Sequence, residues 1–193
     1  MSDDDRRRWD ERHKRRLDSG RDWFVQAADG SADHPPGFFA LLPDHFPTSG
    51  TAIDVACGLG AGALWLAHRG LTVIGWDVSP VAVEAANAAA ARAGLSDRCR
   101  FEVADLDGGL PPGPAADVIL CTCFRAPDLY PEFVARLNPG GVLAIATLSE
   151  VGDEPGDYRA TPGELNESFA ALEILESNEG DGVTVLVGRR PRS

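Results

Sequence analysis

A chain of 193 residues with 44% apolar side chains is long enough for a single domain, 1–193, with a buried core. Its formal net charge of −12 repels the phosphates of DNA and RNA, so nucleic acid is not expected as a partner. No apolar stretch reaches the length of a membrane span and no signal peptide is visible, which predicts a cytoplasmic protein with no membrane partner.

The first 46 residues are predicted to form a helical extension of the domain. Residues 3–18 form a charged helical pattern, and because acids alternate with the bases we expect a solvated helix face rather than a tail for nucleic acid. An irregular segment from Gly20 to Pro36 follows. Pro35-Pro36 then predicts a short helix over 37–46, with Phe38, Phe39 and Phe46 among its apolar residues.

The stretch 51–77 has the pattern of a strand, a glycine-rich turn, a helix and a second strand. The first apolar run, 52–56, contains one acid, Asp54, and the turn Cys57-Gly58-Leu59-Gly60-Ala61-Gly62 follows it. The helical pattern stops at Gly70, and the second strand ends on Asp77. Glycines let a backbone approach a nucleotide-like cofactor, and an acid at the tip of the second strand can accept from both hydroxyls of a ribose.

The rest of the chain continues to alternate. Ser79-Pro80 predicts the start of a helix, with serine as the N-cap. We expect the following elements: a helix over 81–93, a strand over 100–104, a strand over 117–122, a helix over 127–137, a tight turn over 138–141, a strand over 142–147, a mobile polar loop over 150–159, a helix from the capping box Thr161-x-x-Glu164 to Ala170, and a hairpin of strands 172–176 and 183–189.

This alternation predicts the α/β class. The sheet is expected to be Rossmann-like and doubly wound, with seven strands, mostly parallel, and one antiparallel strand from the C-terminal hairpin.

Two cofactor classes are compatible with the glycine turn. Gly58-x-Gly60-x-x-Ala63 with Asp77 about 20 residues on fits a dinucleotide site. S-adenosylmethionine (SAM) is the other class, and it alone accounts for an acid at position 54, where a dinucleotide site normally has an apolar residue. A dehydrogenase also needs a catalytic set such as Tyr/Lys, yet the chain has no lysine besides Lys14.

Four motifs in order resemble the class I SAM-dependent methyltransferases. They are Ile53-Asp54-Val55-Ala56-Cys57-Gly58-x-Gly60, Gly75-Trp76-Asp77-Val78-Ser79-Pro80, Phe101-Glu102-Val103-Ala104-Asp105-Leu106 and Leu137-Asn138-Pro139-Gly140-Gly141-Val142-Leu143. Within this superfamily the chain is similar to small bacterial tellurite-resistance-type methyltransferases, including their N-terminal Arg8-Trp9-Asp10-x-Arg12. The resemblance covers nearly the whole chain.

The resemblance implies SAM as the cofactor. It places Asp54 at the amine of SAM, Asp77 at the ribose and Asp105 at the adenine amine. Val78, which follows Asp77, and Leu106, which follows Asp105, are expected on the two faces of the adenine ring. The expected cofactor-binding residues are Asp54, Ala56, Cys57, Gly58, Gly60, Asp77, Val78, Asp105, Leu106 and Cys121. Ala56 departs from the family, which has glycine there, and we expect its small methyl group to be tolerated.

The expected reaction is in-line methyl transfer to a small-molecule acceptor. No general base and no catalytic residue can be named, which favours a thiol or another soft acceptor that needs no base. Cys123 and Arg125 are candidates for the acceptor pocket, and Trp9 and Arg12 for a lid over the cofactor; each of these also has a purely structural interpretation. The alternatives are a degenerate SAM-binding protein with a regulatory role and an NAD(P)-dependent oxidoreductase. Neither the four histidines nor the four cysteines show metal-ligand spacing, so no metal is expected, and the protein is expected to be a monomer or homodimer.

Overall fold

The computed structural model describes residues 3–19, 37–40 and 42–192. The expected irregular segment from Gly20 to Pro36 lies outside these residues. The chain divides into two compact units, Met1–Pro111 and Pro112–Ser193, called here the N-terminal and C-terminal units. The single-domain organisation expected for 1–193 stays a prediction.

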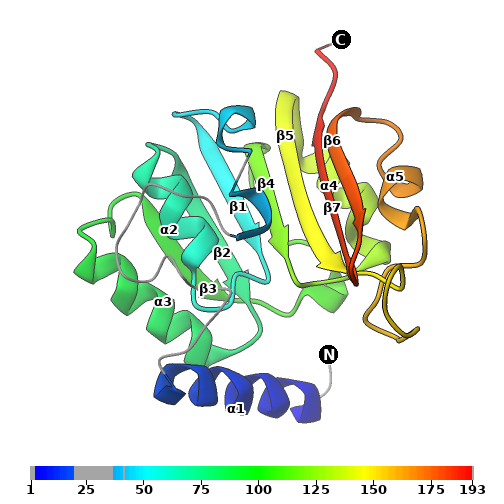
Figure 1. Cartoon of the computed structure of the whole chain (residues 1–193). Coiled ribbons are helices and arrows are strands. Elements are labelled where there is room, and N and C mark those ends of the chain that lie inside the picture. Colours follow the sequence, from blue (N-terminus) through cyan, green and yellow to red (C-terminus); the bar gives the residue numbers. More distant parts are fainter. Residues whose placement is uncertain (1–2, 20–36, 41, 193) are drawn as a thin grey trace. The chain divides into compact units, whose positions relative to one another are not determined.

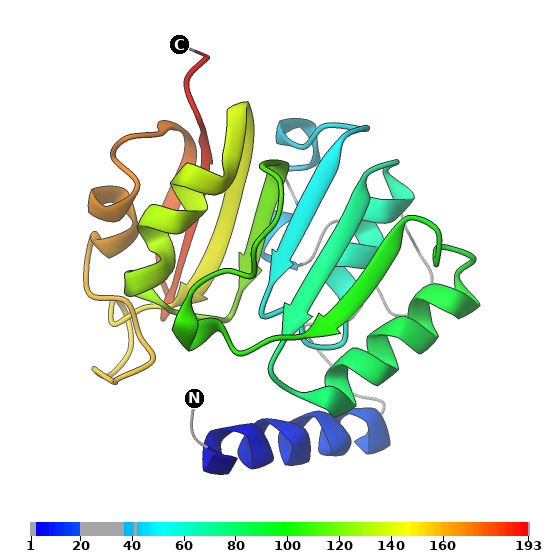
Figure 2. The ribbon, with the colours of Figure 1, turned by 180° about the vertical axis from the view of Figure 1, so that it is seen from behind.

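The N-terminal unit contains three parallel strands in the order β3-β2-β1. The strands are β1 (Thr51–Val55), β2 (Thr72–Asp77) and β3 (Cys99–Val103); the helices are α1 (Asp3–Ser19), α2 (Ala61–His68) and α3 (Pro80–Arg92), with short 3-10 turns η1 (Gly37–Phe39), η2 (Pro43–His45) and η3 (Leu106–Gly108). Helix α2 packs on β1 and β2, α3 packs mainly on β3, and α1 crosses the carboxyl ends of these strands and contacts α3 (Figures 1 and 2).

The C-terminal unit contains the strands β4 (Ala116–Thr122), β5 (Leu137–Leu148), β6 (Glu173–Gly180) and β7 (Val183–Arg189), with η4 (Pro127–Leu129), α4 (Tyr130–Arg136) and α5 (Glu164–Ser168). Strands β4 and β5 are parallel, and β7 runs antiparallel to both β5 and β6. The strand order of the whole sheet is β3-β2-β1-β4-β5-β7-β6. The seven-stranded, mostly parallel α/β fold with one antiparallel strand is therefore confirmed.

Local turn chemistry explains the predictions that succeeded. Ser79 caps α3 by accepting a hydrogen bond at its Oγ from the backbone N–H of Ala82 at 3.2 Å, and Pro80 is the first helical residue. The hairpin between β6 and β7 turns at Asp181 and Gly182, whose φ angles of 50° and 76° suit a tight two-residue turn.

The helix expected over 37–46 is wrong, because the structure has the 3-10 turns η1 and η2 there. Pro43 explains this, since it lacks an N–H to donate and disfavours helical backbone at the residue before it. Leu42 accordingly has φ −120° and ψ 28°. Phe39 and Phe46 are nevertheless buried, and Phe46 meets Trp65 of α2 edge-to-face with ring centroids 4.9 Å apart.

The tight turn expected over 138–141 is a bulge inside one long strand. The register between β4 and β5 jumps from Ala116↔Leu137 to Val118↔Val142, so β5 carries extra residues at this point. Their backbone groups pair outside the regular ladder: Gly140 N donates to Arg190 O and Arg190 N to Gly141 O, both at 2.8 Å. The sequence showed the glycines but not this partner, which lies 50 residues away.

The loop expected to be mobile over 150–159 is held by many hydrogen bonds. Ser149 and Ala160 form a parallel bridge, Glu150 N donates to Ala160 O at 3.0 Å, and Gly182 N donates to Val151 O at 2.8 Å. Arg159 donates from Nη1 to Ser149 O at 2.9 Å and from Nη2 to Asp153 Oδ2 at 2.5 Å. The loop is therefore a fixed part of the C-terminal unit.

Helix α5 is shorter than expected and begins after Gly163 rather than at the capping box. Glu164 does reach back to accept from Thr161 N at 3.2 Å, which is half of a capping box. The Thr161 hydroxyl, however, donates to Glu164 Oε2 at 3.3 Å instead of accepting from the helix.

Candidate functional site

The turn between β1 and α2 has left-handed backbone at every second residue. Ala56, Gly58 and Gly60 have φ angles of 53°, 52° and 84°. Cys57 N donates to Trp76 O and Gly60 N to Cys57 O, both at 2.9 Å, so the turn is hydrogen-bonded to the end of β2 and to itself. Left-handed backbone at these positions lets the chain pass close to a nucleotide-like ligand.

Ala56 is therefore in a conformation that favours glycine, and we expect Ala56→Gly to raise the free energy of unfolding by about 1 kcal/mol. The measurement is denaturant unfolding of the variant against the native protein. Ala88→Gly in the exposed interior of α3 is the matched control, because there the same change should lower the free energy of unfolding by about 1 kcal/mol. A destabilised Ala56→Gly would contradict the strain.

Asp54 is a buried carboxylate with one oxygen unpaired. It is 2% exposed, and its Oδ2 accepts from Ala63 N near the start of α2 at 2.9 Å. Its Oδ1 is buried and has no hydrogen-bond partner. Burial raises the pKa of Asp54 to about 7, opposed by the Ala63 hydrogen bond and assisted by the charge of Asp77. A buried acceptor without a donor is costly unless a ligand supplies one.

Asp77 joins the two turns that carry the site. Its Oδ2 accepts from Gly58 N at 2.8 Å and its Oδ1 from Ser79 N at 2.9 Å. The carboxylate thus connects the turn after β1 to the turn after β2 and is 7% exposed. Each carboxylate oxygen can accept a second hydrogen bond, so these contacts leave capacity for the two hydroxyls of a ribose.

Two glycines make room for the ring of Phe101. A Cβ on Gly60 would lie 2.6 Å from Phe101 Cζ, and a Cβ on Gly75 would lie 2.5 Å from Phe101 Cδ1 and 3.0 Å from Cys57 Sγ. Gly75 is paired directly with Phe101 in the register of β2 and β3. The glycine at 60 therefore serves packing as well as backbone conformation.

The remaining predicted cofactor residues of the N-terminal unit divide into buried and exposed groups. Cys57 is buried, and burial together with the charges of Asp54 and Asp77 raises the pKa of its thiol well above the usual range, so it stays neutral. Asp105 is exposed and accepts from Asp107 N at 3.0 Å, which with the charge of Arg6 lowers its pKa. Leu106 is buried and Val78 half-buried.

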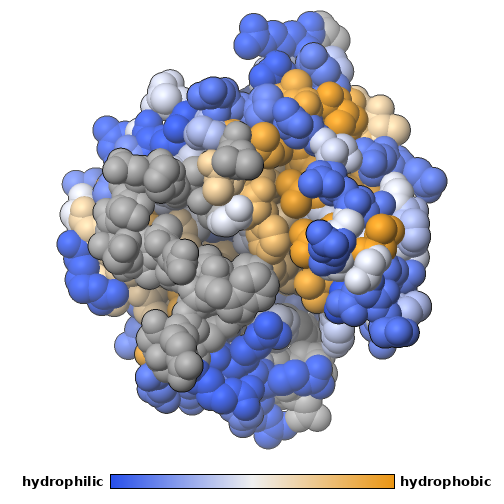
Figure 3. All heavy atoms as spheres, viewed as in Figure 1, coloured by the Kyte–Doolittle hydropathy of each residue, from blue (hydrophilic) through white to orange (hydrophobic). Residues whose placement is uncertain are grey.

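Helix α1 reaches the turn after β2 and the glycine turn through two residues that were not predicted as site residues. Asp10 accepts from Ser79 Oγ, and the His13 ring lies 3.4 Å from the position that a Cβ on Gly58 would take. His13 is 3% exposed and stacks on Trp9, over which the Arg12 guanidinium lies at 5.0 Å. Trp9 and Arg12 were predicted as lid residues, whereas His13 was not. His13 lies four residues after Trp9 and therefore on the same face of the helix, which is the signal that could have identified it. The outer surface of α1 is hydrophilic (Figure 3).

The C-terminal unit holds the other three predicted residues. Cys121, at the end of β4, is fully buried, and its thiol donates to Phe124 O at 3.4 Å. Cys123 is exposed and has left-handed backbone, with φ 59°. Arg125 makes a two-pronged ion pair with Glu164, from Nε to Oε1 at 2.8 Å and from Nη2 to Oε2 at 2.7 Å.

Within the described ranges, no group of three or more His, Cys, Asp or Glu side chains is placed to hold a metal ion. The same part of the chain contains no helix that is long and apolar enough to cross a membrane.

Comparison with known proteins decides between the two cofactor classes. Residues 52–141, which include β1, the glycine turn and Asp77, match the family described as "Methyltransferase domain". Residues 52–141 thus form a methyltransferase domain. The dinucleotide interpretation of the glycine turn is thereby set aside, and SAM is the cofactor class to which the site belongs.

Relatives of this methyltransferase domain act on different kinds of acceptor. A probable chloroplastic tocopherol O-methyltransferase of Oryza sativa subsp. japonica is 33% identical over 138 residues, which are 66% of this chain and 37% of that protein. The ribosomal protein L11 methyltransferase of Vibrio cholerae serotype O1 is 34% identical over 130 residues, which are 65% of this chain and 43% of that protein. The chain thus spans less than half the length of these two curated relatives.

Among solved structures, TehB from Haemophilus influenzae superposes with a TM-score of 0.65 at 20% identity, over 74% of this chain and 58% of TehB. At this identity the likeness concerns the fold.

Two features of the structure are compatible with SAM as the ligand of the methyltransferase domain. The fit rests on Asp54 Oδ1, a buried acceptor that calls for a donor such as an amine, and on the left-handed turn at Ala56, Gly58 and Gly60. All cofactor candidates except Cys121 lie in the N-terminal unit.

Proposed function

We propose that this chain is a SAM-dependent methyltransferase that acts on a small-molecule acceptor. The observation that carries the proposal is the unpaired Oδ1 of Asp54, because the other contacts of the three site acids are already explained by the fold. Asp77 and Asp105 accept backbone N–H groups, and so does the second oxygen of Asp54. Among the oxygens of these three acids, all of which lie in the described residues, only Asp54 Oδ1 is buried without a donor, and the amine of SAM is the donor that the family would supply there.

The proposed roles of the other residues follow from their positions. The backbone from Ala56 to Gly60 cradles the methionine part, and Asp77 accepts from the ribose hydroxyls. Asp105 accepts from the adenine amine, with Val78 and Leu106 against the ring. When bound, SAM supplies an electrophilic methyl group on a positively charged sulfur. The residues of the chain orient it and exclude water, which is most of what methyl transfer requires.

Helix α1 is proposed to cover this site. Its contacts through Asp10 and His13 hold it over the carboxyl ends of β1 and β2, and Trp9 and Arg12 support His13 from the outer side. The lid proposed for Trp9 and Arg12 would therefore touch the cofactor turn chiefly through His13.

A small acceptor is supported by charge. The net charge of −12 disfavours RNA, and the tocopherol methyltransferase among the relatives is named for a small acceptor. An oxyanion acceptor is disfavoured at Arg125, because the guanidinium is already paired with Glu164. All four cysteines lie in the described residues and none is in a disulfide, which supports a reducing compartment such as the cytoplasm.

Asp77→Asn is expected to weaken SAM binding about tenfold, because the variant loses a charge and a hydrogen-bond acceptor at the ribose. Calorimetric titration of the native protein and the variant with SAM, and with NAD for comparison, measures this. Asp97→Asn is the control, since Asp97 is exposed and its substitution should leave the affinity unchanged.

A folded native protein that binds NAD but not SAM would overturn the proposed function. SAM binding without methyl consumption by any acceptor would instead favour a degenerate SAM-binding protein. That second candidate is favoured by the structural roles of Asp77 and Asp105, which a chain without activity would still need.

A further inference from the structure

Helix α1 buries a histidine against the glycine turn. His13 is 3% exposed, whereas its chain neighbours Arg12 and Lys14 are exposed. Its Cε1 lies 3.4 Å from the position that a Cβ on Gly58 would take. Cε1 is the carbon between the two ring nitrogens, so both nitrogens lie on the edge of the ring that faces the turn. Burying an imidazole costs more than burying an apolar side chain, so packing alone does not account for this residue.

The imidazole is held at the turn from its own helix and from the strand ends. It stacks on Trp9, with ring centroids 6.0 Å apart and an angle of 28° between the ring planes. Asp10 of the same helix accepts from Ser79 Oγ, and Ser79 N donates to Asp77 Oδ1 at 2.9 Å. All of these residues belong to the N-terminal unit, so the position of His13 is set within one compact unit.

The charges beside the turn leave one group of SAM without a partner. SAM carries an ammonium group, a positively charged sulfur and a carboxylate. Asp54 and Asp77 are the acids at the turn, and their proposed partners are the ammonium group and the ribose hydroxyls. They also engage two backbone donors of this region, Ala63 N and Gly58 N. Because two carboxylates repel a third, the carboxylate of SAM needs a further hydrogen-bond donor at the turn.

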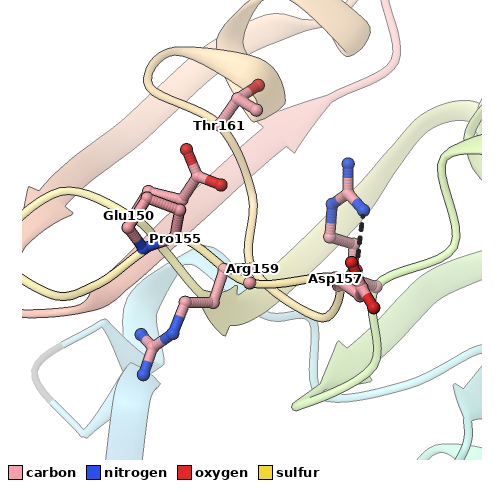
Figure 4. A pocket seen from close by; sticks show the side chains of 7 residues that line it. Glu150, Pro155, Asp157, Arg159 and Thr161 are labelled. Atoms are coloured by element: carbon pink, nitrogen blue, oxygen red, sulfur yellow. Dashed lines mark hydrogen bonds between the residues drawn. The ribbon is translucent and has the colours of Figure 1, made fainter.

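Several arginines are engaged away from the glycine turn. Arg69 and Arg98 donate to backbone carbonyls at the amino ends of β1 and β2, whereas the turn follows the carboxyl end of β1. In the C-terminal unit, Arg125 and Arg159 line an open pocket of about 500 Å³ (Figure 4), and each already pairs with an acid. Of these basic side chains, His13 is the one that contacts the glycine turn.

We propose that His13 binds the carboxylate of SAM by donating a ring N–H to it. The inference rests on the proposed methyltransferase function. The imidazole has an N–H in both its neutral and its charged form, so it can donate in either. Helix α1 is then a part of the binding site that selects methyl donors with a complete amino-acid end, in addition to covering the site.

The test compares SAM with decarboxylated SAM, which keeps the ammonium group, the sulfonium, the ribose and the adenine but lacks the carboxylate. Calorimetric titration measures both affinities in the native protein and in His13→Phe, where a ring remains to stack on Trp9 but donates no hydrogen bond. We expect the native protein to bind SAM at least about tenfold better than decarboxylated SAM, and His13→Phe to bind the two equally well. His68→Phe, at an exposed position of α2, is the matched control and should keep the preference.

Three results would overturn the role of His13: equal binding of the two ligands by the native protein, an unchanged preference in His13→Phe, or the same loss for both ligands in that variant, which indicates a structural role. Nuclear magnetic resonance of the native protein follows the bond without a variant. SAM should shift the ring ¹⁵N signals of His13 further than decarboxylated SAM does, and equal shifts would contradict the proposal. If neither ligand binds the folded native protein, the methyltransferase function itself fails. If both bind without a preference that depends on His13, only the role of His13 fails.

Discussion

Asp54→Asn is expected to weaken SAM binding about a hundredfold, because a buried carboxylate that meets an ammonium group is replaced by a neutral amide. The amide oxygen can keep the hydrogen bond from Ala63 N, so the fold is preserved while Oδ1 is lost. Calorimetric titration measures the loss. Glu84→Gln on the exposed face of α3 is the matched control and should bind SAM normally.

Because the pKa of Asp54 is raised to about 7, the affinity for SAM is expected to depend on pH. Below pH 7 Asp54 is protonated in the free protein, so binding the ammonium group must release a proton. Affinity should therefore rise by roughly tenfold or more between pH 5.5 and 7.5, with proton release visible as a dependence on buffer ionisation enthalpy. Above about pH 8 the amine itself loses its proton, so the comparison ends there. A flat profile in the native protein would contradict the role of Asp54.

The carboxyl group of Asp54 also makes the free energy of unfolding depend on pH, but stability falls where the affinity for SAM rises. Its pKa in the folded protein lies above the ordinary value of 3.8, so its contribution to stability is complete below pH 4 and is lost as the pH rises through 7. Between pH 5 and 8 the loss is about 3 kcal/mol in the free energy of unfolding. Asp54→Asn should lack this loss, which denaturant unfolding at the two pH values measures.

Gly75→Ala is expected to lower the free energy of unfolding by about 3 kcal/mol. The added methyl group would lie 2.5 Å from Phe101 Cδ1 and 3.0 Å from Cys57 Sγ, both in the interior of the N-terminal unit. Denaturant unfolding measures the effect. Gly108→Ala is the control, because nothing lies within 4 Å of its added methyl group and the change should be nearly neutral.

A double-mutant cycle identifies the cause. Phe101→Leu removes the ring edge that the methyl group would strike, so Gly75→Ala should cost about 1–2 kcal/mol less in the Phe101→Leu background than alone. Strict additivity of the two changes would place the clash elsewhere.

Features set by neighbouring residues could be predicted from the sequence. The N-cap at Ser79, the hairpin at Asp181-Gly182 and the acid inside β1 each depend on a few adjacent positions, and the structure has all three. The alternation of strands and helices likewise gave the fold class, because burial periodicity is local.

Features set by distant partners could not be predicted. The bulge in β5 depends on Arg190, and the fixed loop depends on Arg159 and its carbonyl partners. The charged sequence of α1 predicted a solvated helix face, with Trp9 and Arg12 as lid candidates, but it did not indicate that His13 is buried against Gly58, 45 positions away. In each case the local sequence describes the segment taken alone, and a contact with a residue far along the chain determines the structure that the segment adopts.

The structural role of Asp77 affects how this residue would be retained during evolution. Because it fastens the turn at Gly58 to the turn at Ser79, selection for folding alone would retain it after catalysis had ceased. A lineage that lost its methyl donor would go on displaying the second motif of an active enzyme. Asp54 would be the first of these acids to be replaced, because its buried carboxylate serves ligand binding but lowers the stability of the fold.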